Sequence, residues 1–246
     1  MQLLSVNVGD LKKASPVRRL GRSTAIAGLR DVHLGGYIHR DVKPANMCFG
    51  ISPQTRHVLV LVDFGLVRRY KNMDGTVRPL RSRAGFRGTV RYVSIRVHER
   101  IDQGPADDLV SLVYSGQCRY SLNNFFGLEL LVGDLPWKYI MKGDDVKRAK
   151  LELQSGDPQT SFLALTCDSF QEFARAVLSL NTEEEPNYAA LQALLTELVG
   201  DRKMSDPYDW ETNYREAIEG VRVYPYGFQP KCRSRRRCHA VIEEAY

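Results

Sequence analysis

The chain has 246 residues, a formal net charge of +6 and 43% hydrophobic residues, which is ordinary for a globular protein with one large core. Its sequence contains no apolar run long enough to cross a bilayer and no signal-peptide core among its first residues, so we expect neither a membrane span nor a membrane partner. The five cysteines are odd in number and scattered, which argues against a disulfide framework and predicts a reducing compartment, cytoplasmic or nuclear.

The first regular element that the pattern predicts is a helix that begins after Ser23, a residue type that often caps helices. Its apolar side includes Leu29 and ends with His33, and the glycine pair that starts at Gly35 is expected to end the helix. An apolar, β-branched run over residues 57–62 then predicts a buried strand.

The rest of the chain reads as mainly helical. Residues 66–98 are basic and mostly irregular, and Asp107 and Asp108 are expected to open a helix that continues through Leu112. Further helices are predicted over residues 143–154, 168–180 and 187–200, and another apolar segment over residues 126–132.

Two polar motifs stand on either side of the predicted strand. The first reads His-Arg-Asp-Val-Lys-Pro-Ala-Asn from His39 to Asn46, and the second is Asp63-Phe64-Gly65. The strand carries Asp63 to its end, and Gly65 permits a sharp turn there. The two motifs in this order, with a strand between them, are a rare combination and indicate a functional site.

The residue types in these motifs suit phosphoryl transfer. That reaction needs a positioned hydroxyl, neutralised phosphate charge and in-line geometry more than covalent help from protein. Asp41 is the candidate for orienting a hydroxyl and accepting its proton, and Lys43 can reach a phosphate as a point charge. Asn46 and Asp63 offer oxygen ligands, which suit a hard cation such as Mg²⁺.

With these motifs the chain resembles the C-terminal lobe of a serine/threonine protein kinase of the casein kinase type I group, and more narrowly its tau-tubulin kinase branch. The resemblance implies a mainly α (α+β) fold, use of ATP and Mg, and protein substrates that are acidic or already phosphorylated. The matching segments run, with breaks, from Met1 to about Glu211 and include Arg78-Pro79, Ala84–Tyr92, Ser94–Arg96, Asp107–Leu109, Leu135–Trp137 and Ser205–Glu211.

The resemblance also implies a role for each matching position. Asp41 would be the catalytic base, with Lys43 and Thr89 in contact with it, and Asn46 and Asp63 would hold the metal. The Leu4 backbone and the Cys48 side chain would line the floor of the adenine site. Asp108 would brace the backbone of His39 and Arg40. His39 and Phe64 would be two members of a stacked apolar spine.

Positive charge gathers in the segment beside the catalytic motif and in the tail over residues 231–237. A basic surface near Asp41 would suit acidic or phosphorylated substrates. Alternatively, any one of these basic side chains could simply lie on a solvated face of the protein without binding an anion. The tail resembles a nuclear-localisation or nucleic-acid patch, but it lacks interleaved aromatic residues, which argues against nucleic acid. The candidate anion-site residues are Arg91, Lys147, Arg148 and Lys150.

Three departures from the family pattern stand out. Residues 1–11 resemble the hinge between kinase lobes, so the β-rich N-terminal lobe that roofs ATP is expected to be missing. The stretch from Asp10 to His39 is shorter than in the family by on the order of two helical turns. A segment at about 115–125, rich in poor helix formers, interrupts the expected central helix.

With these departures, we divide the chain into three parts and keep three hypotheses about its function. Residues 1–11 are a hinge-like remnant, 12–211 form the kinase lobe and 212–246 are an extension with a basic tail. The chain is expected to be a serine/threonine protein kinase whose activity alone is impaired because the N-terminal lobe is absent, and the three departures suggest an incomplete or mispredicted gene model. The alternatives are a catalytically inactive scaffold that binds acidic or phosphorylated peptides, and a non-functional fragment.

Overall fold

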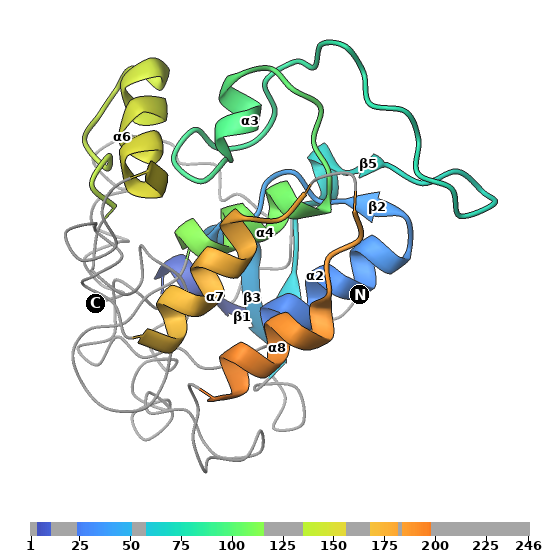
Figure 1. Cartoon of the computed structure of the whole chain (residues 1–246). Helices are drawn as coiled ribbons and strands as arrows, with labels where there is room; N and C mark the ends of the chain where they lie inside the picture. The colour runs from blue at the N-terminus through green and yellow to red at the C-terminus, as the bar shows by residue number, and fades with distance from the viewer. Residues whose placement is uncertain are drawn as a thin grey trace, which may run out of the picture.

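The computed structural model describes residues 4–10, 24–50, 58–115, 135–155, 168–181 and 184–197, and these form a mixed helical and sheet structure that is mostly helical (Figure 1). In chain order the elements are β1 (Leu4–Asn7), α2 (Thr24–Leu34), β2 (Tyr37–Ile38), η1 (Pro44–Asn46), β3 (Met47–Gly50), β4 (Leu59–Leu61), η2 (Phe64–Leu66), β5 (Arg68–Arg69), α3 (Ile95–His98), α4 (Pro105–Ser115), α6 (Gly143–Ser155), α7 (Asp168–Leu178) and α8 (Tyr188–Glu197).

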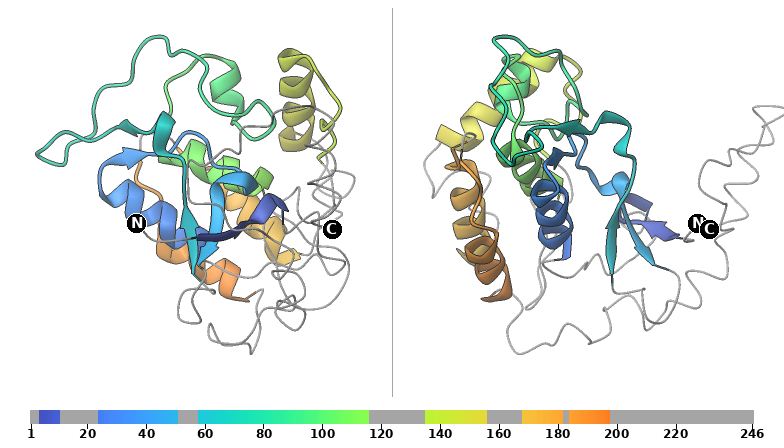
Figure 2. Two further views of the ribbon diagram at one scale, coloured as in Figure 1. Left: turned by 180° about the vertical axis from the view of Figure 1, so that it is seen from behind. Right: turned by 90° about the vertical axis from the view of Figure 1, so that its right-hand side faces the viewer.

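Two small antiparallel sheets lie beside the helices (Figure 2). The first has the strand order β1-β3-β4, and in its β3-β4 pair Met47 lies opposite Leu61. The second pairs β2 with β5, so that Ile38 lies opposite Arg68. Because β2 ends just before His39 and β3 begins just after Asn46, the two sheets fix both ends of the first polar motif.

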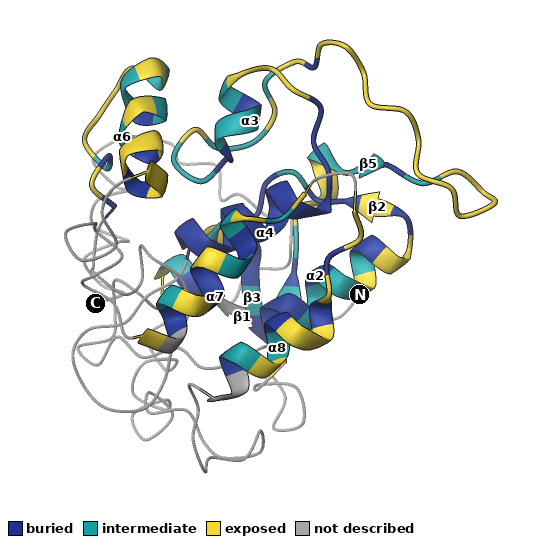
Figure 3. Cartoon of the chain, in the orientation of Figure 1, coloured by how far each residue is buried: buried dark blue, intermediate teal, exposed yellow. Residues whose placement is uncertain are grey.

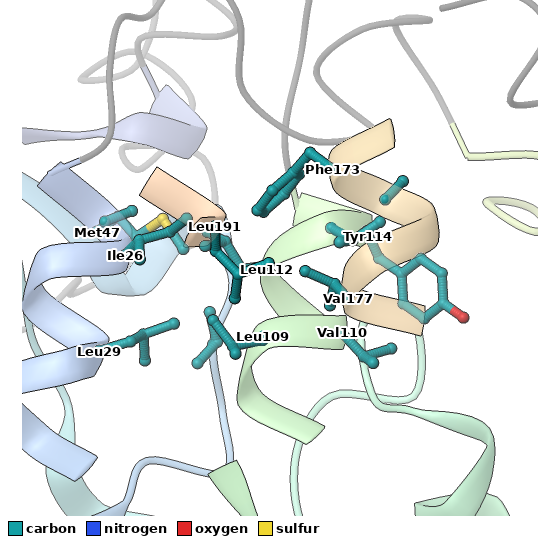
Figure 4. Close-up of a cluster of buried hydrophobic side chains, with 14 of the residues drawn as sticks. Ile26, Leu29, Met47, Leu109, Val110, Leu112, Tyr114, Phe173, Val177 and Leu191 are labelled. Carbon is teal, nitrogen blue, oxygen red and sulfur yellow. The ribbon is translucent and has the colours of Figure 1, made fainter. Parts of the chain in front are cut away.

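Helix α4 runs through the middle of the molecule, and all of its residues are buried (Figure 3). It packs against α2 and α7, and α8 packs against both α2 and α7. The close-up in Figure 4 shows Leu109 and Leu112 of α4 between Leu29 of α2 and Val177 of α7. The helix begins with proline and then two carboxylates, which suit the first turn because proline needs no backbone donor there and negative charge complements the helix dipole.

Most element predictions are confirmed by the structure. The helix predicted after Ser23 is α2, which ends at Leu34 before Gly36 turns the chain with a φ of 83°. The strand within residues 57–62 is β4, and residues 66–98 are mostly irregular. The helices predicted at Asp107 and over residues 143–154, 168–180 and 187–200 correspond to α4, α6, α7 and α8.

Other predictions fall on residues that the structure does not describe. Helix α4 ends at Ser115, so the proposed interruption at about 115–125 and the apolar segment over residues 126–132 lie almost wholly outside the described residues. The expected cap at Ser23 and the basic tail lie outside them as well. None of the described helices has the length and apolar character that a bilayer crossing requires.

One buried carboxylate holds much of the irregular segment in place. Asp102 is only 1% exposed, and its carboxylate accepts hydrogen bonds from the backbone N–H of Arg81 at 3.0 Å and from the side chains of Arg81 and Arg68. Burial alone would raise the pKa of this carboxyl, but the hydrogen bonds from Arg81 and Arg68 outweigh burial and hold the pKa far below its usual range. Asp102 therefore ties β5 to the segment around Arg81.

We expect Phe173→Ala to lower the free energy of unfolding by about 3–5 kcal/mol, because it removes a ring that is 2% exposed at the α7 side of the core. Urea unfolding followed by circular dichroism measures this change. Met141→Ala, at a side chain that is 94% exposed, is the control and should change stability by less than about 0.5 kcal/mol. Equal effects of the two substitutions would contradict the burial of Phe173 in this core.

We expect the stability lost in Asp102→Asn to depend on pH. Because folding lowers the pKa of Asp102, its carboxylate stabilises the folded state above its unfolded-state pKa of about 3.9, and this stabilisation is lost as pH falls further. The difference in thermal midpoint between wild type and Asp102→Asn should therefore be large near pH 7 and shrink at about pH 3. Asp31→Asn, at an exposed pair on α2, is the matched control. A difference for Asp102→Asn that stays constant over this range would contradict the ion-pair assignment.

Candidate active site

The loop between β2 and η1 has an unusual backbone that a buried carboxylate supports. Arg40 has a φ of 68°, a left-handed conformation that is costly for a residue with a side chain. The backbone N–H groups of His39 and Arg40 donate to the two carboxylate oxygens of Asp108 at 2.6 and 2.8 Å. Asp108 lies in the first turn of α4 and is 2% exposed. The central helix thus fixes the start of this loop.

A histidine and a tyrosine complete the surroundings of Asp108. The Nε2 atom of His33 lies 3.0 Å from the Asp108 carboxylate, and its Nδ1 atom lies 2.6 Å from the hydroxyl of Tyr188. Because a carboxylate accepts hydrogen bonds, the Nε2 atom of His33 is the donor to Asp108, and the Nδ1 atom faces the Tyr188 hydroxyl. The network joins α2, α8 and α4 beneath the loop that carries Asp41.

Four polar side chains converge on this loop. The Asp41 carboxylate accepts from the Lys43 ammonium at 2.6 Å, from the Thr89 hydroxyl at 2.7 Å and from the Asn46 amide at 3.2 Å. Lys43 also donates to the Thr89 hydroxyl oxygen at 3.2 Å. The structure therefore brings together Asp41, Lys43, Asn46 and Thr89, which sequence spacing alone leaves up to 48 residues apart.

These contacts set the charge of Asp41. Burial favours the neutral carboxyl, but hydrogen bonds from Lys43 and Thr89, the positive charge of Lys43 and a hydrogen bond from Asn46 outweigh it, so the pKa of Asp41 is lowered. The group is therefore ionised near neutral pH, with lone pairs that can receive a proton from a hydroxyl.

Gly88 allows the Thr89 segment to approach the loop closely. Its φ is 108°, and an added Cβ atom would lie 2.5 Å from the carbonyl oxygen of Arg40. Any larger residue here would push the backbone away from Arg40, and with it the hydroxyl of Thr89.

The two expected metal ligands lie at the same end of the β3-β4 hairpin. Asn46 directly precedes β3 and Asp63 follows β4, and the N–H of Val62 donates to the Asn46 carbonyl at 3.0 Å. Within the described residues, the hydrogen bonds given for the Asn46 side chain use its amide nitrogen, and its amide oxygen is the atom that would bind a cation. Asp63 is exposed, so an amide oxygen and a carboxylate are available to a hard cation such as Mg²⁺.

The turn after β4 differs in one detail from the expectation for Gly65. The left-handed residue is Asp63, with a φ of 63°, whereas Gly65 lies within η2 and donates its N–H to the Asp63 carboxylate at 3.4 Å. An asparagine or aspartate tolerates this conformation better than most residues with a side chain. The ring centroids of Phe64 and His39 lie 4.9 Å apart with the rings tilted by 55°, so these two side chains are in contact.

The expected adenine-floor residues share the three-stranded sheet. Leu4 of β1 lies opposite Gly50, and Cys48 of β3 lies opposite Asn7. Burial, followed by the charge of Asp10, raises the pKa of the Cys48 thiol to about 11, so this thiol stays neutral.

Each of the four candidate anion-site residues already has a partner within the protein. Lys147 pairs with Glu99 at 3.0 Å, and Arg148 pairs with Asp145 on its own helix. Arg91 donates to the carbonyl of Lys138 at 3.2 Å. The expectation for Lys150 is wrong, because this side chain is 0% exposed and its ammonium donates to backbone carbonyls.

Sequence reasoning missed several residues that shape the site. Asp102 belongs to no recognisable motif. Tyr188 lies in a short helix, where its position predicts only an ordinary core residue. His33 was expected on the apolar side of its helix, without a partner. For His33 and Tyr188 the only signal was a polar atom at an apolar position, which requires a buried hydrogen-bond partner.

Comparison with known proteins adds the family context. No family model matches the chain. It is 39% identical over 225 residues to the protein named "Putative casein kinase I" of Caenorhabditis elegans. This match covers 89% of this chain and 63% of the relative. It is 34% identical over 220 residues to a "Probable serine/threonine-protein kinase" of Dictyostelium discoideum, covering 86% of this chain and 41% of the relative.

A third relative is the "Serine/threonine-protein kinase spe-6" of Caenorhabditis elegans, which is 30% identical over 239 residues, or 92% of this chain and 60% of the relative. The chain thus spans less than two thirds of the length of these three relatives. These relatives, which match most of this chain, are named as a casein kinase I and as serine/threonine protein kinases.

Proposed function

We propose that this chain carries the catalytic centre of a serine/threonine protein kinase, which transfers the γ-phosphate of ATP to a serine or threonine hydroxyl of a protein. The observation that carries this proposal is the ionised Asp41 carboxylate, held by Lys43, Asn46 and Thr89 at hydrogen-bond distance. The named kinases among the homologues support the same reaction class.

In the proposed reaction the oxygen of the substrate hydroxyl attacks the γ-phosphorus, and Asp41 receives the proton of that hydroxyl. The new oxygen–phosphorus bond forms as the bond to ADP breaks, and the proton ends on Asp41. Lys43, whose ammonium is already beside Asp41, is placed to contact the transferred phosphoryl group. Asn46 and Asp63 would hold Mg²⁺, which when bound supplies positive charge against the phosphate oxygens.

A narrower assignment to the casein kinase type I group, and to its tau-tubulin kinase-like branch, is also proposed. The matching segments around Arg78, Thr89 and Ser94 support it. We further propose acidic or phosphorylated protein substrates, because the exposed arginines Arg83 and Arg87 lie close along the chain to Thr89 and make this surface positive.

A second candidate is a non-catalytic scaffold that binds acidic or phosphorylated peptides. The same exposed arginines favour it, since guanidinium groups bind phosphate without any phosphoryl transfer. The two candidates differ in whether Asp41 matters: peptide binding by arginines should survive its replacement, and catalysis should not.

We expect Asp41→Asn to lower phosphate transfer from Mg-ATP to an acidic, serine-containing peptide by at least about 100-fold, because the amide cannot accept the hydroxyl proton. Radiolabel transfer by the purified 246-residue chain measures this, with circular dichroism to verify that the variant folds.

Asp31→Asn is the matched control, because it makes the same chemical change at an exposed site on α2, and its rate should stay within about twofold of wild type. Transfer that survives unchanged in Asp41→Asn would contradict the assigned base. A folded wild-type chain that binds the peptide without transferring phosphate would favour the scaffold instead.

A further inference from the structure

The turn over residues 89–93, which carries the Thr89 hydroxyl to Asp41, has little regular structure of its own. The N–H groups of Tyr92 and Val93 donate to the carbonyl of Thr89 at 2.8 and 3.1 Å. Three other carbonyls of the turn instead accept hydrogen bonds from side chains far away in the sequence. The geometry of the turn therefore depends on those side chains.

Lys150 of α6 supplies two of these bonds. Its ammonium donates to the carbonyls of Val90 at 2.8 Å and Val93 at 2.6 Å, and it lies 3.2 Å from Nε2 of His98. An ammonium group has three N–H donors, and here each has one acceptor. The charge also faces the rings of Tyr114 and Trp137, at 5.2 and 5.6 Å.

Trp137 supplies the third bond. Its indole N–H donates to the carbonyl of Arg91 at 2.9 Å, and the side chain is 1% exposed. The ring packs edge-on against Tyr114 of α4 at 5.3 Å. The turn is thus tied to the core of the molecule through Lys150 and Trp137, which we call the turn clamp.

The charges around the clamp are consistent with this arrangement. Burial, followed by the charge of Lys150, lowers the pKa of His98 to about 4, so its ring is neutral at pH 7 and Nε2 can accept. Burial lowers the pKa of Lys150 to about 7, whereas two carbonyls and two aromatic faces favour its charged form. Lys147, Asp144 and Arg100 also act on His98 through their charges.

We propose that Lys150 and Trp137 are positioning residues that hold the 89–93 turn so that the Thr89 hydroxyl stays on the Asp41 carboxylate. The catalytic part of this inference rests on the proposed kinase function. Thr89 lies only one residue from Val90, so release of the Val90, Arg91 and Val93 carbonyls displaces its hydroxyl. A displacement of about 1 Å at a reacting group can lower a rate by roughly 100-fold.

The first experiment needs no activity. Trypsin can cut after Arg91 only when the turn opens, whereas Arg83 is exposed. We expect Lys150→Met and Trp137→Phe to raise initial cleavage of the Arg91–Tyr92 bond by at least about 10-fold, and to leave cleavage after Arg83 within about twofold. Mass spectrometry of early time points measures both rates.

Both variants keep apolar bulk, but each leaves buried carbonyls without a donor at a cost of about 1–3 kcal/mol for each carbonyl, so circular dichroism first verifies that both variants fold. Lys142→Met, at an exposed lysine just before α6, is the matched control and should resemble wild type. Unchanged cleavage after Arg91, or equal acceleration at both bonds, would overturn the clamp.

The second experiment separates positioning from general structure. We expect Lys150→Met to lower kcat for peptide phosphorylation by about 10-fold or more and to leave the KM for Mg-ATP within about twofold, because the turn reaches the site through the hydrogen bond from Thr89 to Asp41. An unchanged kcat with faster cleavage after Arg91 would overturn the positioning role. A wild-type chain without phosphate transfer would remove the proposed kinase function, and the cleavage result would still decide the clamp.

Discussion

The structure depends on the carboxylate of Asp108, which is buried at the start of the central helix and accepts three hydrogen bonds. A buried carboxylate without partners would be strongly unfavourable, so its three donors offset the loss of water. Two of the donors are the backbone N–H groups of His39 and Arg40, and the third is His33. The same bonds that make Asp108 tolerable in the core support the left-handed Arg40 and place Asp41.

Two further contacts bring the segment from β5 to α3 to this centre. Asp102 binds Arg68 and Arg81 at one side of it, and the turn clamp of Lys150 and Trp137 holds the Thr89 turn at the other. The segment between them has almost no regular structure, so side-chain hydrogen bonds and ion pairs, and not backbone hydrogen bonds of a helix or sheet, fix its position. The hydrogen bond between Thr89 and Asp41 joins this segment to the loop held by Asp108.

Local patterns in the sequence predicted the helices and the catalytic motifs, because these depend on neighbouring residues. The apolar spacing located α2, α7 and α8, and the β-branched run located β4. The grouping of Asp41, Lys43 and Thr89 was expected from the resemblance to kinases, and the fold brings these residues together. The interruption of the central helix near residues 115–125 stays a prediction.

Contacts that depend on the folded chain could not be predicted in the same way. Lys150 lies on a helix rich in charged residues, where a lysine normally faces water, and its burial depends on partners far away in the sequence, among them the carbonyls of Val90 and Val93. Asp102 lies in a short irregular stretch without any periodicity, so its arginine partners could not be inferred. Both cases involve one charged side chain that satisfies backbone or ionic groups far away in sequence.

The most direct test of this account is amide hydrogen exchange at His39 and Arg40, measured by NMR in wild type and in Asp108→Asn. These two N–H groups donate to the buried carboxylate, so they should be strongly protected in wild type and exchange at least about 10-fold faster in the variant. The amides of α7 should keep their protection. Unchanged exchange at His39 and Arg40, or an equal increase throughout α7, would contradict the claim that Asp108 specifically holds the loop that carries Asp41.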